Sequence, residues 1–143
     1  MNNSGDTFLL RTERLNVIFS KKQVLSNLDL AFCHGKITAV IGPSGSGKST
    51  LLKTLNRMTD FIPEAHVEGD VVFKGGSIYA SDVDPTELRR RIGMVFQDAA
   101  IFRKSVFENV AFGLKAGGAR DSGRIEHQVT ESLKKVQLWD TVK

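Results

Sequence analysis

At 143 residues with a net charge of +4, the chain is long enough for one compact domain and too short for two of ordinary size. Hydrophobic residues make up 41% and charged residues 25%, values typical of soluble globular proteins rather than of disordered or fibrous ones. The longest apolar runs fall far below the roughly 20 residues that cross a bilayer, and residues 1–6 lack the pattern of a secretory signal. Because the single Cys33 cannot form an internal disulfide, these features predict a cytoplasmic protein.

The first third of the chain predicts an antiparallel β portion. Alternating apolar positions in residues 8–19 and 24–32 flank a polar turn at residues 20–23, a pattern typical of a β-hairpin. Residues 37–41 then form a short apolar, partly β-branched run, which is typical of a strand buried on both faces of a sheet. We therefore expect residues 37–41 to be a central strand.

A glycine-rich segment, Gly-Pro-Ser-Gly-Ser-Gly-Lys-Ser, follows this run directly at residues 42–49 and fits the phosphate-binding loop (P-loop) pattern. Its glycines permit a tight loop with inward-pointing N–H groups, and the next helix adds the positive end of its dipole. Lys48 would reach the β- and γ-phosphates, and the Ser49 hydroxyl would ligate Mg²⁺. The predicted nucleotide-binding residues of this loop are Gly42, Pro43, Ser44, Gly45, Ser46, Gly47, Lys48, Ser49 and Thr50.

Helices and two more strands are expected downstream. Helical spacing of apolar residues predicts a helix from residue 48 to about 57. Residues 67–73 and 92–96 are strand candidates, and Asp84 followed by Pro85 predicts a helix start. The arginines at positions 89–91 would form a solvated face of that helix.

The last part of the chain predicts two further helices. Ser105 and Glu108 form a capping box for the first. The second is amphipathic, with one apolar face made by Ile125, Val129, Leu133 and Val136.

A P-loop alone does not separate ATPases, GTPases and small-molecule kinases. The sequence contains neither the Asn-Lys-x-Asp nor the Asp-x-x-Gly element of guanine-specific GTPases, and no cluster of lid arginines past mid-chain. These observations favour an ATPase.

Residues 91–97, Arg-Ile-Gly-Met-Val-Phe-Gln, resemble the strand and Q-loop of ABC transporter ATP-binding subunits. The resemblance implies that Gln97 touches the Mg²⁺ and attacking-water site and transmits its state to a membrane subunit. Lys48 and Gln97 are then the implied catalytic residues, and Ser49 and Gln97 the implied metal ligands. Phe19 stands where the family places an aromatic ring that stacks on adenine, although a core phenylalanine is the alternative.

The segments at 55–58, 62–63, 67–69, 78–79, 88–91, 104–110 and 138–140 further resemble the ATP-binding subunit of bacterial phosphate importers. The likeness departs at residues 98–103, where those importers have a proline-rich run and this chain has no proline. The resemblance implies ATP and Mg²⁺ as cofactors, and membrane permease subunits and a second ATP-binding subunit as partners. It also implies a peripheral position on the inner face of the cell membrane and no nucleic acid. Phe102 and Phe107 are expected to receive a helix of the permease, with a core position as the alternative for Phe107.

The family's Walker B strand, signature motif and switch histidine do not occur in these 143 residues. The resemblance therefore implies an incomplete α/β P-loop NTPase fold with an N-terminal antiparallel β portion and a C-terminal helical segment. The chain would be the N-terminal part of one nucleotide-binding domain, with a β-rich P-loop core at 1–97 and a Q-loop and the start of a helical subdomain at 98–143. A truncated gene product, an engineered piece and a partial sequence all fit this expectation.

Two other functions stay open at this point. One is a soluble ABC-type ATPase that acts on nucleic acid, which the positive charge would suit. The other is a non-catalytic fragment that keeps nucleotide binding or an interaction surface.

Overall fold

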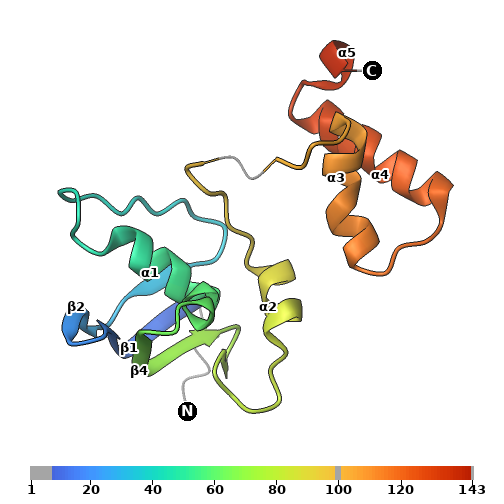
Figure 1. Cartoon of the computed structure of the whole chain (residues 1–143). Helices are drawn as coiled ribbons and strands as arrows, with labels where there is room; N and C mark the ends of the chain where they lie inside the picture. Colours follow the sequence, from blue (N-terminus) through green and yellow to red (C-terminus); the bar gives the residue numbers. More distant parts are fainter. Residues whose placement is uncertain (1–7, 99–100, 143) are drawn as a thin grey trace. The chain divides into compact units, whose positions relative to one another are not determined.

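The computed structural model describes residues 8–98 and 101–142. The chain divides into two compact units, Met1–Val95 and Phe96–Lys143 (Figure 1).

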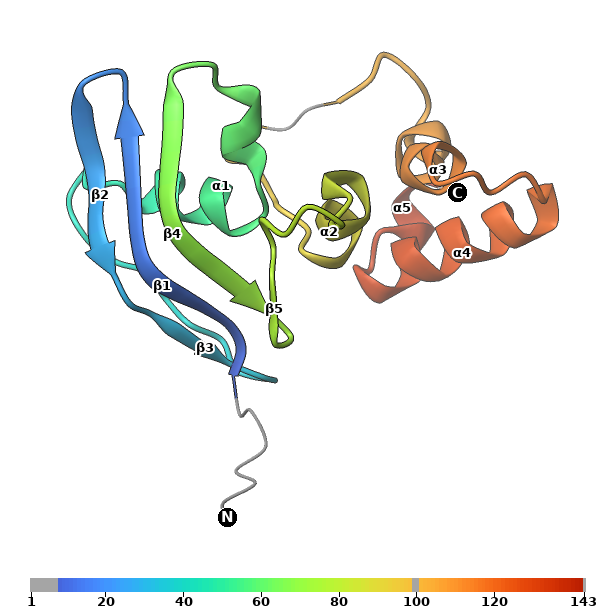
Figure 2. The ribbon, with the colours of Figure 1, turned by 90° about the horizontal axis from the view of Figure 1, so that it is seen from below.

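The first unit is built on an antiparallel sheet with strand order β2-β1-β4-β5, in which β3 also pairs with β1. The predicted hairpin is confirmed, because β1 pairs with β2 and the chain turns at residues 20–21. Strand β1 is the longest and lies between β2 and β4 (Figure 2). The strands are β1 Phe8–Phe19, β2 Lys22–Leu28, β3 Ala31–Cys33, β4 Ala65–Phe73 and β5 Gly76–Ser77.

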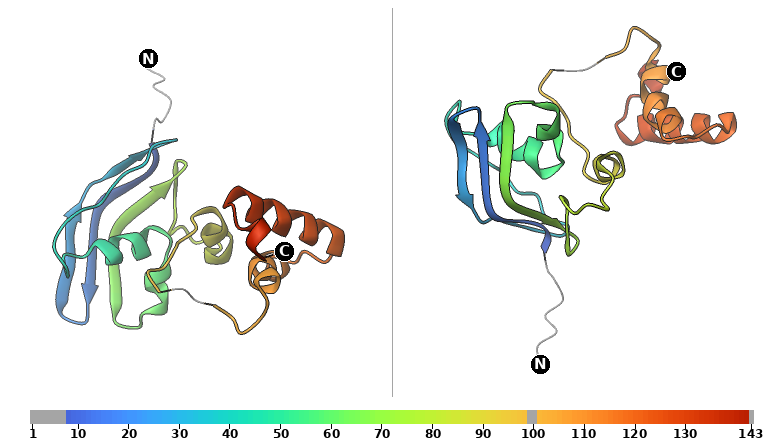
Figure 3. Two further views of the ribbon diagram at one scale, coloured as in Figure 1. Left: turned by 90° about the horizontal axis from the view of Figure 1, so that it is seen from above. Right: turned by 60° about the horizontal axis from the view of Figure 1, so that its bottom comes forward.

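One face of this sheet is covered by helices. The buried cluster contains Leu51 and Leu55 of helix α1 (Lys48–Leu55) and Leu88 of helix α2 (Pro85–Arg91). These side chains pack with the inward residues of the strands, among them Leu15 and Val17, both fully buried. Figures 2 and 3 show α1 and α2 on the same side of the sheet.

A bulge in β1 shifts its alternation. Thr12 and Leu15 are both buried although they are three positions apart, and the β1–β4 register slips between Glu13 and Asn16. Arg14 adopts a left-handed conformation there, with φ of 47°. Gly69 of β4, with φ of 83°, lies so close that a Cβ atom would be 2.3 Å from the Arg14 carbonyl oxygen. Only glycine fits this position without displacing backbone.

The helix starts in the first unit agree with the sequence. Helix α1 begins at Lys48, directly after the glycine loop, and ends at Leu55. Asp84 caps α2 by accepting a hydrogen bond from the Thr86 N–H at 2.8 Å. A single 3₁₀ turn, η1 (Met58–Phe61), follows α1.

Two predicted strands are wrong in this structure. Residues 37–41 and 92–96 have no strand assignment, and Ile37, Ile41 and Val95 are 101%, 90% and 97% exposed. A central strand needs a hydrogen-bonded neighbour on each side, and neither segment has one among the described residues. The apolar composition of both segments is typical of strands, but composition does not supply a hydrogen-bonding partner.

The second unit is helical, as expected, with α3 Val106–Ala116, α4 Ser122–Lys135 and α5 Trp139–Val142. The Ser105–Glu108 capping box is present at the start of α3. The core of the second unit is formed by Ala111, Ile125, Val129 and Leu133. Val136, predicted on the same face, follows the end of α4 and is 62% exposed. None of the helices in residues 8–98 and 101–142 is both long and apolar enough to pass through a bilayer.

Candidate functional site

The P-loop connects the irregular segment 37–41 to helix α1. Residues 42–46 and Ser49 are exposed, and Gly47, Lys48 and Thr50 are half-buried. The loop is closed by a hydrogen bond from the Ser46 N–H to the Pro43 carbonyl at 3.3 Å. The structure thus presents the predicted phosphate-binding residues as one continuous stretch, an exposed loop that leads into the first turn of α1.

Gly47 fixes how this loop meets the sheet. It is the N-cap of α1 in a left-handed conformation, with φ of 90° and no side-chain cap. A Cβ atom here would lie 2.8 Å from Leu25 Cδ2 and 3.2 Å from the Val24 carbonyl oxygen. Glycine therefore lets the start of α1 approach β2 closely, and it leaves the first N–H groups of the helix without a capping side chain.

The Lys48 side chain folds back over the loop. Its Nζ donates to the carbonyl oxygens of Gly42 at 2.8 Å and Pro43 at 2.6 Å, and lies 3.3 Å from Ser46 Oγ. The ammonium group is therefore held on the loop that precedes α1. Uncapped helical N–H groups together with the compact charge of a lysine ammonium suit a phosphate group.

The donor set also fits Mg²⁺–ATP chemically. The Ser49 hydroxyl is exposed in the first turn of α1, and a hydroxyl oxygen suits a hard cation that keeps most of its ligands as phosphate and water. Within the described part of the chain, no group of three or more His, Cys, Asp or Glu side chains is placed to hold a metal ion.

The other two predicted site residues lie away from the loop in sequence. Phe19 ends β1, is half-buried and packs against the core cluster, so its proposed contact with adenine stays a prediction. Gln97 is an exposed residue in a bend and belongs to the second unit. Its role at the metal also stays a prediction.

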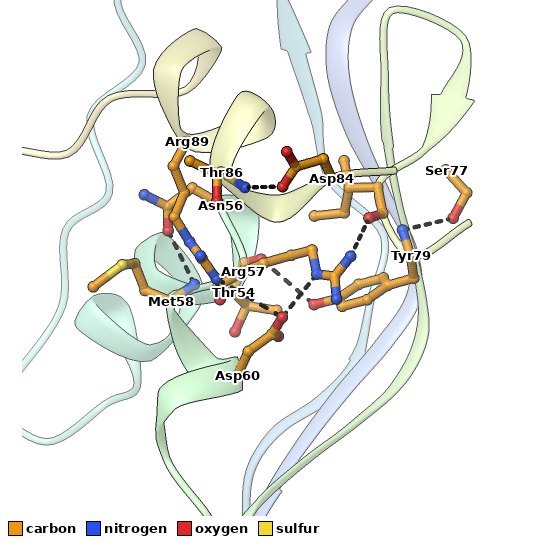
Figure 4. A network of polar contacts seen from close by, with 11 residues as sticks. Thr54, Asn56, Arg57, Met58, Asp60, Ser77, Tyr79, Asp84, Thr86 and Arg89 are labelled. Carbon is orange, nitrogen blue, oxygen red and sulfur yellow. Dashed lines mark hydrogen bonds and ion pairs between the residues drawn. The ribbon is translucent and has the colours of Figure 1, made fainter. Parts of the chain in front are cut away.

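A polar cluster beyond the loop was missed by the sequence analysis (Figure 4). Arg57 Nε contacts Asp60 Oδ2 at 2.9 Å, and Arg89 Nη2 lies 3.8 Å from the same oxygen. The Arg89 guanidinium also stacks on the Phe61 ring at 4.4 Å. The expected solvated face is therefore wrong for Arg89, whose side chain is only 22% exposed, because a partner distant in sequence draws it inward. Arg90 pairs with Glu87 and is 45% exposed, as expected for a surface residue.

Tyr79 packs beside this cluster, with Arg57 over its ring at 5.4 Å. Burial, and next the Asp60 carboxylate, raise the pKa of Tyr79 from 10.0 to about 12. The folded protein thus favours the neutral phenol. The contribution of this pKa shift to the free energy of unfolding is fully present below pH 10 and is lost as the pH rises towards 12.

Because the chain has one tyrosine, its titration can be measured without ambiguity. We expect the tyrosinate absorbance of the folded protein to rise with increasing pH, with a midpoint pH well above the midpoint measured in denaturant. The free energy of unfolding should fall over the same alkaline range. Tyr79→Phe should remove the absorbance step and flatten the alkaline fall in stability. Equal midpoints in folded and denatured protein would contradict the burial argument.

In the second unit, the loop before α3 is organised by Asn109. Its Oδ1 accepts from the Phe102 N–H at 2.9 Å, and its Nδ2 donates to the carbonyls of Phe102, Lys104 and Ser105 at 3.1, 3.2 and 2.9 Å. The Phe102 ring packs on Phe112 with centroids 4.4 Å apart. Asn109 thereby fixes a loop whose Phe102 packs on Phe112 of α3, and both rings are partly exposed.

Phe102 and Phe107 are 45% and 38% exposed, so the core alternative for Phe107 is not supported. Phe107 lines a shallow cavity of about 360 Å³ with Lys115, Ala119, Arg120, Ser122 and Ile125. This cavity combines apolar walls with two cationic side chains.

Three curated relatives match 94% of this chain. They are the "Phosphate import ATP-binding protein PstB 2" of Lactiplantibacillus plantarum at 46% identity, "PstB 1" of Enterococcus faecalis at 45% and "PstB" of Borreliella afzelii at 43%. The match covers 54%, 54% and 52% of these proteins, respectively, so the chain spans about half the length of the curated relatives it matches.

A family model described as "ABC transporter" matches residues 25–143. Among solved structures, a bacterial Atm1-family ABC exporter with ATP bound is similar to this chain, with a TM-score of 0.73 and 25% identity. That match covers 95% of this chain and 22% of the exporter chain. Both findings support the predicted fold class, a partial P-loop NTPase fold.

Proposed function

Because the chain belongs to the ABC transporter family, we propose that it is an ATP-binding, energy-coupling part of an importer and that the imported substrate is phosphate. The P-loop carries this proposal, because its exposed residues, Gly47 turn and Lys48 ammonium form an anion site at the start of α1. The phosphate assignment is supported by the printed names of the relatives at 43–46% identity. The nucleic-acid alternative has no comparable support.

In this proposal the loop residues bind the triphosphate of ATP through backbone N–H groups. Lys48 leaves its three loop oxygens and meets the β- and γ-phosphates, and Ser49 ligates Mg²⁺, which neutralises phosphate charge. Phe19 offers a ring for the adenine and Gln97 orients the metal and water site. Positioning and charge stabilisation of this kind are what phosphoryl transfer requires.

We expect the purified chain to bind Mg–ATP saturably but to release little phosphate. Its 143 residues offer Lys48 and Gln97 but no carboxylate after an apolar strand that would polarise water. Equilibrium titration and steady-state phosphate release measure the two activities, with Lys48→Ala as the background. Absence of saturable binding would overturn the proposed function, and a Lys48-dependent turnover of about 1 s⁻¹ or faster would contradict the expectation of binding without catalysis.

The proposed partners are membrane permease subunits and a second ATP-binding subunit, with the chain peripheral on the inner face of the membrane. Phe102 and Phe107, with the cavity that Phe107 shares with Lys115 and Arg120, form the proposed surface for a permease helix. Exposed aromatic and cationic side chains are effective interface anchors.

Crosslinking tests this surface. A photoreactive group at Phe102 or Lys104 should crosslink to a co-expressed phosphate permease, whereas the same group at Lys134, an exposed residue near the end of α4, should not. Crosslinks confined to Lys134 would contradict the assignment. Ala100, also within the region expected to contact the permease, lies outside the described residues.

A further inference from the structure

Two side-chain hydrogen bonds tie the C-terminal end of the P-loop helix to the C-terminal end of α2, and they run in opposite directions. Asn56, the C-cap of α1, donates from Nδ2 to the Ile92 carbonyl, the C-cap of α2, at 3.4 Å. Arg89 of α2 donates from Nη2 to the Arg57 carbonyl at 2.6 Å. Each helix end therefore supplies a donor to the other.

The second tie is reinforced by charge and stacking. The Asp60 carboxylate faces the guanidinium groups of both Arg57 and Arg89, whose side chains are 19% and 22% exposed. Partial burial reduces screening of these charges by salt, and the Arg89 plane is fixed from the other side by the Phe61 ring. Asn56 itself is 3% exposed. Moving the Ile92 carbonyl away would therefore leave the buried Nδ2 of Asn56 without this acceptor.

The location of these ties relates two parts of the proposed site. Helix α1 starts at Lys48 and ends beside Asn56, and α2 ends at Arg91, six residues before Gln97. The two ties therefore hold Ile92, where the segment that leads to Gln97 begins, against the end of the P-loop helix. A shift of that helix would then move the start of this segment.

We propose that Asn56 and Arg89 are positioning residues that couple nucleotide occupancy of the P-loop to the Gln97 segment. The proposal rests on the proposed function, because it presumes that ATP binds at the loop. If Asn56 and Arg89 had a purely structural role, their variants would be less stable. Bound nucleotide would still change the accessibility of the Gln97 segment as it does in the parent chain.

The test measures coupling separately from affinity. In a Cys33→Ser background, Asp98→Cys places a thiol beside Gln97, and its modification rate is compared without and with saturating Mg–ATP. We expect nucleotide to slow modification about fivefold or more in the parent chain. Arg89→Ala should keep a Kd for Mg–ATP within about threefold of the parent but lose most of this protection, with Arg89→Lys intermediate.

Arg90→Ala is the matched control, because Arg90 is the next residue on α2 and forms an ion pair with Glu87 on the same helix. It should retain both affinity and protection. If Arg89→Ala does not fold, Arg89→Lys and Asn56→Ser carry the test. Full protection in a folded Arg89 or Asn56 variant, protection that falls only in proportion to affinity, or no protection in an ATP-binding parent would each overturn the proposal.

A nucleotide-free measurement separates this proposal from the proposed function. Spin labels at Leu52 of α1 and Thr86 of α2, both exposed, should give a narrow distance distribution in the parent and in Arg90→Ala. The distribution should broaden in Arg89→Ala, and an unchanged distribution would overturn the positioning role. If no variant binds ATP, the proposed function fails while this arm still decides whether the two ties position α2.

Discussion

Replacing Lys48 by alanine is expected to weaken Mg–ATP binding by at least about 30-fold, since truncating one partner of a charge pair costs about 2 kcal/mol or more. The free energy of unfolding should change by less than about 1 kcal/mol, because the hydrogen bonds that Lys48 makes to Gly42, Pro43 and Ser46 are exposed. A fluorescent ATP analogue titrated into the folded variant measures the first quantity, and urea denaturation the second.

Lys53→Ala provides the control for this prediction. Lys53 lies on the same helix, in its last turn, so the variant changes net charge equally and leaves the loop intact. Its affinity should stay within about threefold of the parent, as for a long-range charge screened by salt. Equal affinities for the parent and a folded Lys48→Ala chain would refute the P-loop assignment.

The largest expected loss of stability comes from Gly69→Ala. The new Cβ would lie 2.3 Å from the Arg14 carbonyl oxygen and 2.5 Å from that of Glu13. Because both are backbone atoms in the bulge of β1, they can yield only if β1 and β4 separate. We expect a loss of about 2–5 kcal/mol, the sum of left-handed strain and steric overlap, measured by urea denaturation followed by circular dichroism.

Gly75→Ala separates the two contributions. Gly75 has nearly the same φ, 84°, but a Cβ there would have no atom within 4 Å, so this variant should lose only about 1–2 kcal/mol. The difference between the two variants measures the steric overlap at the bulge. Equal losses would mean that the sheet relaxes freely around Gly69 and that the close approach does not constrain the fold.

The features that sequence determined by itself are those whose signals lie within a few residues. The capping side chains of Asp84 and Ser105 bond to N–H groups two and three positions away, so the helix starts follow from local sequence. The P-loop is a contiguous pattern, and its glycines impose the turn into α1 wherever the helix packs. The predicted hairpin likewise required only a short polar turn between two alternating runs.

Only the tertiary structure decided the features that depend on distant partners. Residues 37–41 have a strand-like composition, but a strand forms only where another strand supplies its hydrogen bonds, and no described segment does so. Arg89 looked like a surface residue, yet its guanidinium meets the Arg57 carbonyl 32 positions earlier in the chain. Gly69 faces Arg14 in the same way, across two strands. Local sequence sets each residue's conformational preference, but the partner that satisfies a buried charge, a backbone donor or a close contact is fixed only when the chain has folded.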